Sequence, residues 1–246
     1  GFGGTNMIVW AHRGFSSRYP ENTMVAFEAA RNAGADGIET DVHLTKDGEV
    51  VVIHDENLLR TTGVDKKVCD CTLSEITKIK ASKTMDDKFD AYVPSFEEFC
   101  AFIKESGMKA NVELKTGVIY YPGIEEKVAS LIRKYGIEDK VIFSSFNPLS
   151  LVIMQKYLPE CKMGFLFTNP INIKHISYLA KEVGFSFLHP EYKIISEEML
   201  NEAKACDLGI NAWTINDPEE VKNLMDWGVE GTITNDPEMC LKAIGR

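Results

Sequence analysis

The sequence contains no run of apolar residues approaching the roughly 20 that a membrane-spanning helix needs. It also contains no G-x-G-x-x-G or G-x-x-x-x-G-K motif, the glycine-rich loops that hold nucleotide phosphates in many α/β proteins. Positive charge is scarce, because 27 Lys and Arg residues face 37 Asp and Glu residues, giving a formal net charge of -10. This balance argues against binding of a nucleic-acid backbone or of an anionic membrane surface. An anionic substrate would have to be met by local cations or by a metal ion.

The six cysteines are scattered along the chain and lack the spacing of a metal site. Cys69 and Cys71 are too close in an extended chain for an easy disulfide, so we expect reduced thiols in a cytoplasmic protein. No signal-peptide pattern precedes Met7, and residues 1–6 are interpreted as an expression remnant before a native start. A processed secreted protein would also lack its signal here, and that alternative stays open.

Strand patterns and helix patterns alternate along the 246 residues. We expect strands at 8–11, 38–55 (a hairpin), 109–115, 141–145, 162–167, 185–188, 210–213 and 231–234. Helices are expected up to about 32 after a cap at Asn22 or Thr23, after a cap at Ser95, and at 124–135, 148–157, 172–182, 197–205, 218–227 and 237–244. Eight such units favour a closed (β/α)8 TIM barrel over an open doubly wound sheet. We predict one barrel domain over residues 1–246, with a small insertion at 58–93 after the second strand region.

The expected hairpin at 38–55 carries polar residues where a buried strand would hide apolar ones. Glu39, Asp41 and His43 alternate with mostly apolar residues, the period-2 pattern of a strand with two different faces. Two carboxylates on one strand face need either water or a cation. A solvated strand face would explain this pattern alone, so its interpretation depends on the other polar residues of the chain.

The Asp47-Gly48 pair predicts a two-residue hairpin turn, because positive φ is easily adopted there. Such a turn would pair Lys46 with Glu49 and place His54 opposite Asp41. A register two residues different would place it opposite the other carboxylate of the strand. In either register we expect His54 to lie beside the two acids, within the roughly 5 Å typical of cross-strand neighbours.

In a (β/α)8 barrel the active site lies at the C-terminal ends of the strands. The polar residues expected there are His12 and Arg13 on the first strand, Glu39 and Asp41 on the second, Glu113 and Lys115 on the third, and Trp213 on the seventh. Carboxylates gathered at one rim repel each other unless a cation neutralises them, and oxygen ligands alone suit Mg²⁺ or Ca²⁺ rather than Zn²⁺. An ion pair between Lys115 and Glu113, and core packing of Trp213, are the alternative interpretations. Weaker candidates at strand ends are Phe146, His189 and Asn235.

This inventory matches the physical needs of phosphodiester cleavage. The negative oxygens on phosphorus would be neutralised by the metal, Arg13 and Lys115. The attacking oxygen needs a base and the leaving alkoxide needs an acid, and His12 and His54 can divide these roles near neutral pH. The residues leave open which histidine is the acid.

Taken together, these motifs resemble the glycerophosphodiester phosphodiesterase family. The resemblance rests on His12-Arg13-Gly14, Pro20-Glu21-Asn22-Thr23, Glu39-x-Asp41, Asp47-Gly48, His54-Asp55, Glu113-x-Lys115, Trp213-Thr214 and Gly231-x-x-x-Asn235-Asp236-Pro237. It implies a metal-dependent barrel hydrolase that cuts glycerophosphodiesters to sn-glycerol 3-phosphate and an alcohol. It also implies that Glu39, Asp41 and Glu113 bind the metal, that His12 and His54 are the acid–base pair, and that 58–93 is the family's insertion.

Two other functions compete with this interpretation. The same chemistry on a lysophospholipid would be a phospholipase D-like cleavage, which calls for an apolar channel or a membrane-docking surface. A barrel that merely binds phosphodiesters or Ca²⁺ would be favoured if a catalytic histidine were replaced, and both His12 and His54 are present. We expect a small-molecule substrate, with neither nucleic acid nor stable membrane insertion, while head group, metal and oligomeric state stay open.

Overall fold

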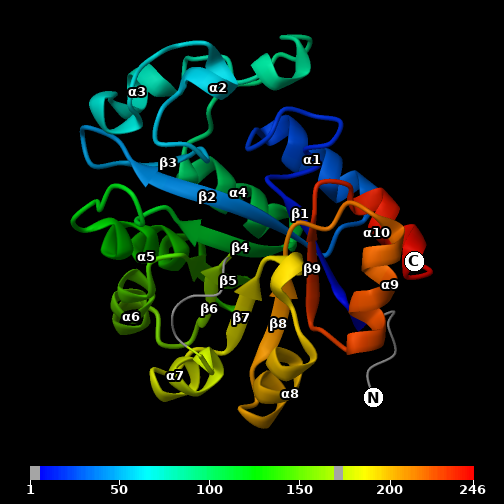
Figure 1. Ribbon diagram of the computed structural model, residues 1–246. Helices are drawn as coiled ribbons and strands as arrows, with labels where there is room; N and C mark the ends of the chain where they lie inside the picture. The colour runs from blue at the N-terminus through cyan, green and yellow to red at the C-terminus, as the bar shows by residue number, and fades with distance from the viewer. Residues whose placement is uncertain (1–5, 169–173) are drawn as a thin grey trace.

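The computed structural model describes residues 6–168 and 174–246. Within these ranges, eight strands pair in parallel and close into a barrel (Figure 1). They are β1 (Ile8–His12), β2 (Gly37–Leu44), β4 (Lys109–Leu114), β5 (Val141–Ser145), β6 (Lys162–Phe167), β7 (Phe187–Pro190), β8 (Gly209–Ala212) and β9 (Gly231–Thr234). Strand β1 pairs with both β9 and β2, and this double pairing closes the ring. The predicted (β/α)8 barrel is confirmed, although β7 and β8 are displaced from their expected positions by one or two residues.

Helices surround the barrel and are separated from it by an apolar layer (Figure 1). They are α1 (Met24–Ala33), α4 (Phe96–Ser106), α5 (Ile124–Tyr135), α6 (Pro148–Tyr157), α7 (Ile176–Glu182), α8 (Glu197–Ala205), α9 (Pro218–Trp227) and α10 (Pro237–Ala243). Polar side chains cap several of them, and Thr23 rather than Asn22 accepts the backbone N–H bond at the start of α1. The helix expected at 172–182 begins at Ile176, and positions 172 and 173 lie outside the described residues. No described helix has the length and apolar character needed to cross a membrane.

The hairpin register differs from the predicted one. Strand β3 (Val50–Val52) pairs antiparallel with β2, with Leu44 opposite Val50, and the Thr45 N–H donates to the Glu49 carbonyl at 2.9 Å. The predicted pairing of Lys46 with Glu49 is therefore wrong. The loop has three residues and ends at Gly48, whose φ of 75° lies in the left-handed region. The extra residue shifts the register by one, so His54 follows β3 rather than lying opposite Asp41 in the ladder.

The segment between β3 and α4 forms a small apolar cluster of its own. It contains α2 (Leu59–Thr62), α3 (Leu73–Ile76) and two short 3-10 turns (Val68–Asp70 and Lys83–Met85). Its buried side chains pack with Val51 and Ile53 of the hairpin instead of with the main core; they include Leu58, Val68, Cys71, Ile76, Ala81 and Val93. Figure 1 shows α2 and α3 beside the hairpin at one end of the barrel, next to the loop that leads into α1.

Candidate active site

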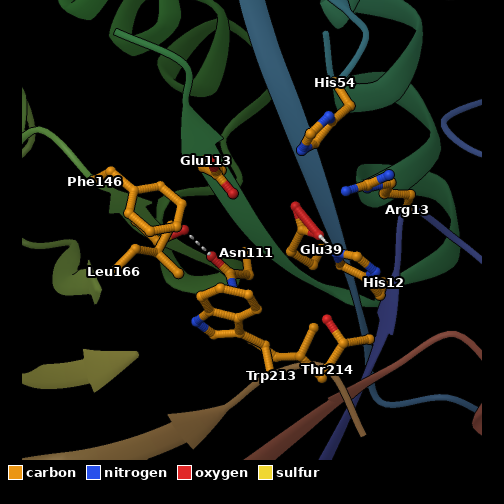
Figure 2. A pocket seen from close by; sticks show the side chains of 12 residues that line it. His12, Arg13, Glu39, His54, Asn111, Glu113, Phe146, Leu166, Trp213 and Thr214 are labelled. Carbon is orange, nitrogen blue, oxygen red and sulfur yellow. Dashed lines mark hydrogen bonds and ion pairs between the residues drawn. The ribbon is translucent and has the colours of Figure 1, made fainter. Parts of the chain in front are cut away.

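The three predicted acidic residues come together. Glu39 and Asp41 are two residues apart on β2, and Asp41 lies opposite Glu113 of β4 in the parallel register. Because side chains alternate along a strand, all three point to the barrel axis. Each is buried, and one carboxylate oxygen from each lies within 4.8 Å of the others. Glu39 and Glu113 approach one another across the pocket in Figure 2.

Several of these carboxylate oxygens have no hydrogen-bond partner among the described residues. They are both oxygens of Glu39 and the Oδ1 atom of Asp41, and all three are buried. The other Asp41 oxygen accepts a 2.9 Å bond from the Asn22 amide, whose own oxygen accepts from Thr40 at 2.8 Å. Burial of unpaired anionic oxygens is costly unless a cation accompanies them. The donor set therefore fits a hard divalent cation such as Mg²⁺ or Ca²⁺.

Burial is the largest influence on the protonation of this cluster. It raises the pKa of Glu39 well above its usual value and that of Glu113 to about 8, and the Asp41 carboxylate adds to both shifts. Burial also acts to raise the pKa of Asp41, but nearby positive groups outweigh it and hold that pKa well below its usual range. The groups responsible are His54, Arg13 and Lys115. A bound divalent cation would favour the ionised form of both glutamates, because it would offset the charge that burial penalises.

His12 is the last residue of β1, and its ring is held by a residue that follows β9, the strand that pairs with β1. Its Nδ1 atom lies 2.7 Å from the side-chain oxygen of Asn235, which also accepts from Ser16 at 3.0 Å. Because an amide oxygen can only accept, Nδ1 is the protonated nitrogen. Burial, with the charge of Arg13, lowers the pKa of His12 to about 4. Its Nε2 atom is thus unprotonated and lies 3.5 Å from Glu39 Oε2.

His54 is fixed at its ring and at its backbone. The ring Nδ1 atom lies 2.6 Å from Asp55 Oδ1. The backbone carbonyl accepts a 2.9 Å bond from His43 Nε2, and the other nitrogen of His43 lies 2.7 Å from the Tyr121 hydroxyl. Since a carbonyl only accepts, His43 carries its proton on Nε2 and Tyr121 donates to Nδ1. These hydrogen bonds join His43 to Tyr121 in the loop after β4 and to the backbone of His54. They explain why a histidine is buried on β2.

The two cations predicted for the site each lie beside one of the acids, and only Arg13 lines the pocket. Arg13 donates to Glu21 at 3.0 Å and lies 3.9 Å from Asp41. The turn after it packs tightly, because a Cβ atom on Gly14 (φ 84°) would lie 2.7 Å from the side chain of Ala26. Lys115 lies 3.4 Å from Glu113, so the ion pair considered as an alternative is present.

The remaining candidates divide between the pocket wall and the barrel interior. Trp213 lines the pocket, donates its indole N–H to the His189 carbonyl at 2.8 Å, and meets Phe146 edge-on at 5.9 Å between ring centroids. Phe146 is partly exposed on the same wall (Figure 2). The His189 ring is fully buried near Asn211 and does not line the pocket, and Asn235 contacts His12.

Sequence reasoning missed several of these contacts. Asn22 was considered only as one of two possible helix caps, the other being Thr23, yet its side chain orients Asp41. Its backbone has a φ of 52°, in the left-handed region that Asn tolerates better than most residues. The spacing of residues along the sequence does not indicate the hydrogen bonds among Asp55, Glu21 and Arg60, because these bonds depend on how the loops meet in space.

One pocket at the carboxyl ends of the strands is lined by two of the acids (Glu39 and Glu113), by both histidines and by the aromatic wall. A closed parallel barrel with a polar pocket at this end is the arrangement of a (β/α)8-barrel enzyme. The family described as the glycerophosphoryl diester phosphodiesterase family matches residues 12–239. The chain belongs to this family of phosphodiesterases.

Several related proteins match nearly the whole length of the chain. The glycerophosphodiester phosphodiesterase of Caldanaerobacter subterraneus subsp. tengcongensis is 40% identical over 238 residues, covering 96% of this chain and 97% of that protein. The enzyme of that name from Bacillus altitudinis is 39% identical, covering 95% and 96%. A solved phosphodiesterase of Oleispira antarctica, in complex with the product sn-glycerol-3-phosphate, is similar with a TM-score of 0.86 at 27% identity, covering 97% of each chain.

Proposed function

We propose that the protein hydrolyses glycerophosphodiesters to sn-glycerol 3-phosphate and an alcohol with the help of a divalent cation. The observation that carries the proposal is the buried acid cluster, with its unpaired oxygens, between two separately held histidines. Family membership and the product bound to the Oleispira antarctica relative support the same substrate class. The six free thiols support a cytoplasmic location.

In this mechanism Glu39, Asp41 and Glu113 hold Mg²⁺ or Ca²⁺, which supplies positive charge to the phosphoryl oxygens. Arg13 and Lys115 add to that charge and orient the phosphodiester.

The partners of the two histidines suggest how proton transfer is divided. His12 donates Nδ1–H to a neutral amide, and its free Nε2 can take the proton of the attacking oxygen. Beside His54, the Asp55 carboxylate stabilises the imidazolium that donates a proton to the leaving alkoxide. We therefore assign His12 as the base and His54 as the acid. Trp213 contributes an apolar wall for the bound substrate.

The direct test measures release of glycerol 3-phosphate from glycerophosphocholine and glycerophosphoethanolamine, with Mg²⁺ or Ca²⁺ added to metal-stripped protein. We expect turnover only when metal and substrate are both present. Absence of product from every glycerophosphodiester, with every metal, would exclude the proposed activity.

Lysophospholipids form a second candidate substrate class. Two exposed apolar side chains lie near Phe146 in the sequence or at the end of the neighbouring strand: Leu149 is in the first turn of α6, and Val118 is in the loop after β4. Such a rim could receive an acyl chain. Lysophosphatidylcholine belongs in the same assay, and its cleavage at a rate matching the glycerophosphodiesters would favour this class.

The raised pKa values of the glutamates predict that metal binding competes with protons. In the metal-free protein, the stability provided by protonated Glu113 is present at low pH and is lost as pH rises through about 8. A fixed concentration of Mg²⁺ should therefore raise the Tm more at about pH 8 than at about pH 6. Differential scanning calorimetry measures this, and Glu113→Gln should reduce the pH dependence and leave the part that comes from Glu39. Equal Tm shifts at both pH values would contradict the prediction.

A further inference from the structure

Arg60 of α2 binds two carboxylates at once. Its Nη1 and Nη2 atoms donate to the two oxygens of Glu21 at 2.6 and 2.9 Å. Its Nε and Nη2 atoms donate to the two oxygens of Asp55 at 2.9 and 3.1 Å. The planar guanidinium thus joins the loop before α1 to the loop after β3 through two fork-like contacts.

Each of these carboxylates continues to a residue of the pocket. Glu21 also accepts a hydrogen bond from a second arginine, Arg13, at 3.0 Å. Asp55 lies 2.6 Å from the ring nitrogen of His54. The charges of the two arginines and the two carboxylates in this hydrogen-bonded path cancel. The Glu21 side chain is only 10% exposed. An ordinary surface ion pair ends at its partner, whereas Arg60 is the middle of a continuous path between two pocket residues.

We propose that Arg60 is a positioning residue that sets the orientation of His54 and Arg13 together. The proposal rests on the proposed function for the roles of those two side chains, but the linkage itself depends only on the contacts. Through it, the segment between β3 and α4 takes part in the chemistry without touching substrate. Lysine cannot replace Arg60, because one ammonium lacks the planar fork that engages four oxygens.

The kinetic test compares Arg60→Lys with a matched control, Arg31→Lys. Arg31 also makes a two-bond contact with one carboxylate, Glu105, at 2.8 and 3.2 Å, and it is similarly exposed at 37% against 43%. We expect Arg60→Lys to lower kcat and raise KM, with a roughly 10- to 100-fold loss in kcat/KM, the scale seen for outer partners of site residues. The control should behave as wild type.

Single partners should separate the two effects. Asp55→Asn should reproduce the fall in kcat, since it affects His54, and Glu21→Gln should reproduce the rise in KM, since it affects Arg13. The double variant Arg60→Lys/Asp55→Asn should have a kcat no lower than that of Asp55→Asn alone, because both changes break one path. Arg60→Gln provides a second variant if the lysine form does not fold.

A spectroscopic readout tests the linkage without substrate. In histidine-labelled protein, the Nδ1 proton resonance of His54, assigned by its loss in Asp55→Asn, should move in Arg60→Lys and stay in place in Arg31→Lys. An unmoved resonance, wild-type kcat and KM in Arg60→Lys, or equal losses in the control would each overturn the proposal. If wild-type protein cleaves no glycerophosphodiester, the proposed function fails, and the resonance alone decides whether Arg60 orients His54.

Discussion

His54→Ala and His12→Ala are each expected to slow release of glycerol 3-phosphate by roughly 10²- to 10⁴-fold, the usual scale for losing a general acid or base. Neither change removes an oxygen of the acid cluster, so both variants should retain the metal. Calorimetric titration with Mg²⁺ or Ca²⁺, alongside steady-state kinetics, measures the two properties separately. His175→Ala, a change at an exposed histidine paired with Glu202, is the control for the kinetics and should leave turnover unchanged.

A substrate with a much better leaving group identifies the acid. Such a substrate needs little protonation of the departing oxygen, so it should rescue the variant that lacks the acid. With His54 held by Asp55, we expect strong rescue of His54→Ala and weak rescue of His12→Ala. The reverse pattern would exchange the two roles. Loss of metal binding in His54→Ala would show instead that this residue is a ligand.

Removal of the metal is expected to abolish turnover, with recovery on addition of Mg²⁺ or Ca²⁺. The physical reason is the buried oxygens of Glu39 and Asp41 that lack partners among the described residues. Glu39→Gln should weaken metal affinity by more than the roughly 10- to 100-fold that loss of an outer partner costs, because it removes a ligand charge. Full activity after exhaustive chelation would contradict the whole assignment of the acid cluster.

The matched control for Glu39→Gln is Glu125→Gln. Glu125 is also buried, but its two oxygens accept bonds from Tyr120 at 2.8 Å and Ser150 at 3.2 Å, outside the pocket. Its substitution tests whether loss of any buried carboxylate disturbs the barrel. We expect unchanged metal affinity in Glu125→Gln, measured in the same titrations, so an effect there equal to that of Glu39→Gln would point to a general loss of structure.

The acid cluster was predictable from sequence because two simple regularities determine it. Alternation along a strand places Glu39 and Asp41 on one face, and the carboxyl ends of parallel strands meet at one rim, which brings Glu113 beside them. Neither regularity depends on the details of loops. The barrel itself followed from eight repeated strand and helix units for the same reason.

The hairpin register and the contacts between loops were not predictable in this way. One additional residue in the turn moved the pairing of β3, since turn geometry and not turn composition sets the register. The path through Arg60 of α2 joins residues from two loops, and the bond from Tyr121 to His43 spans 78 positions. Such bonds form only after the strands have positioned the loops, so no local sequence pattern predicts them.

The closure of the barrel between β1 and β9 has a consequence for the newly synthesised protein. All the charged residues of the pocket emerge from the ribosome within the first 115 positions, whereas Asn235, which orients His12, is made only after β9. Because domains are synthesised from their N-terminus, a nascent chain carries the acidic cluster long before its first histidine has a partner. Since we propose that His12 is the base, we expect a chain that ends before β9 to lack hydrolytic activity.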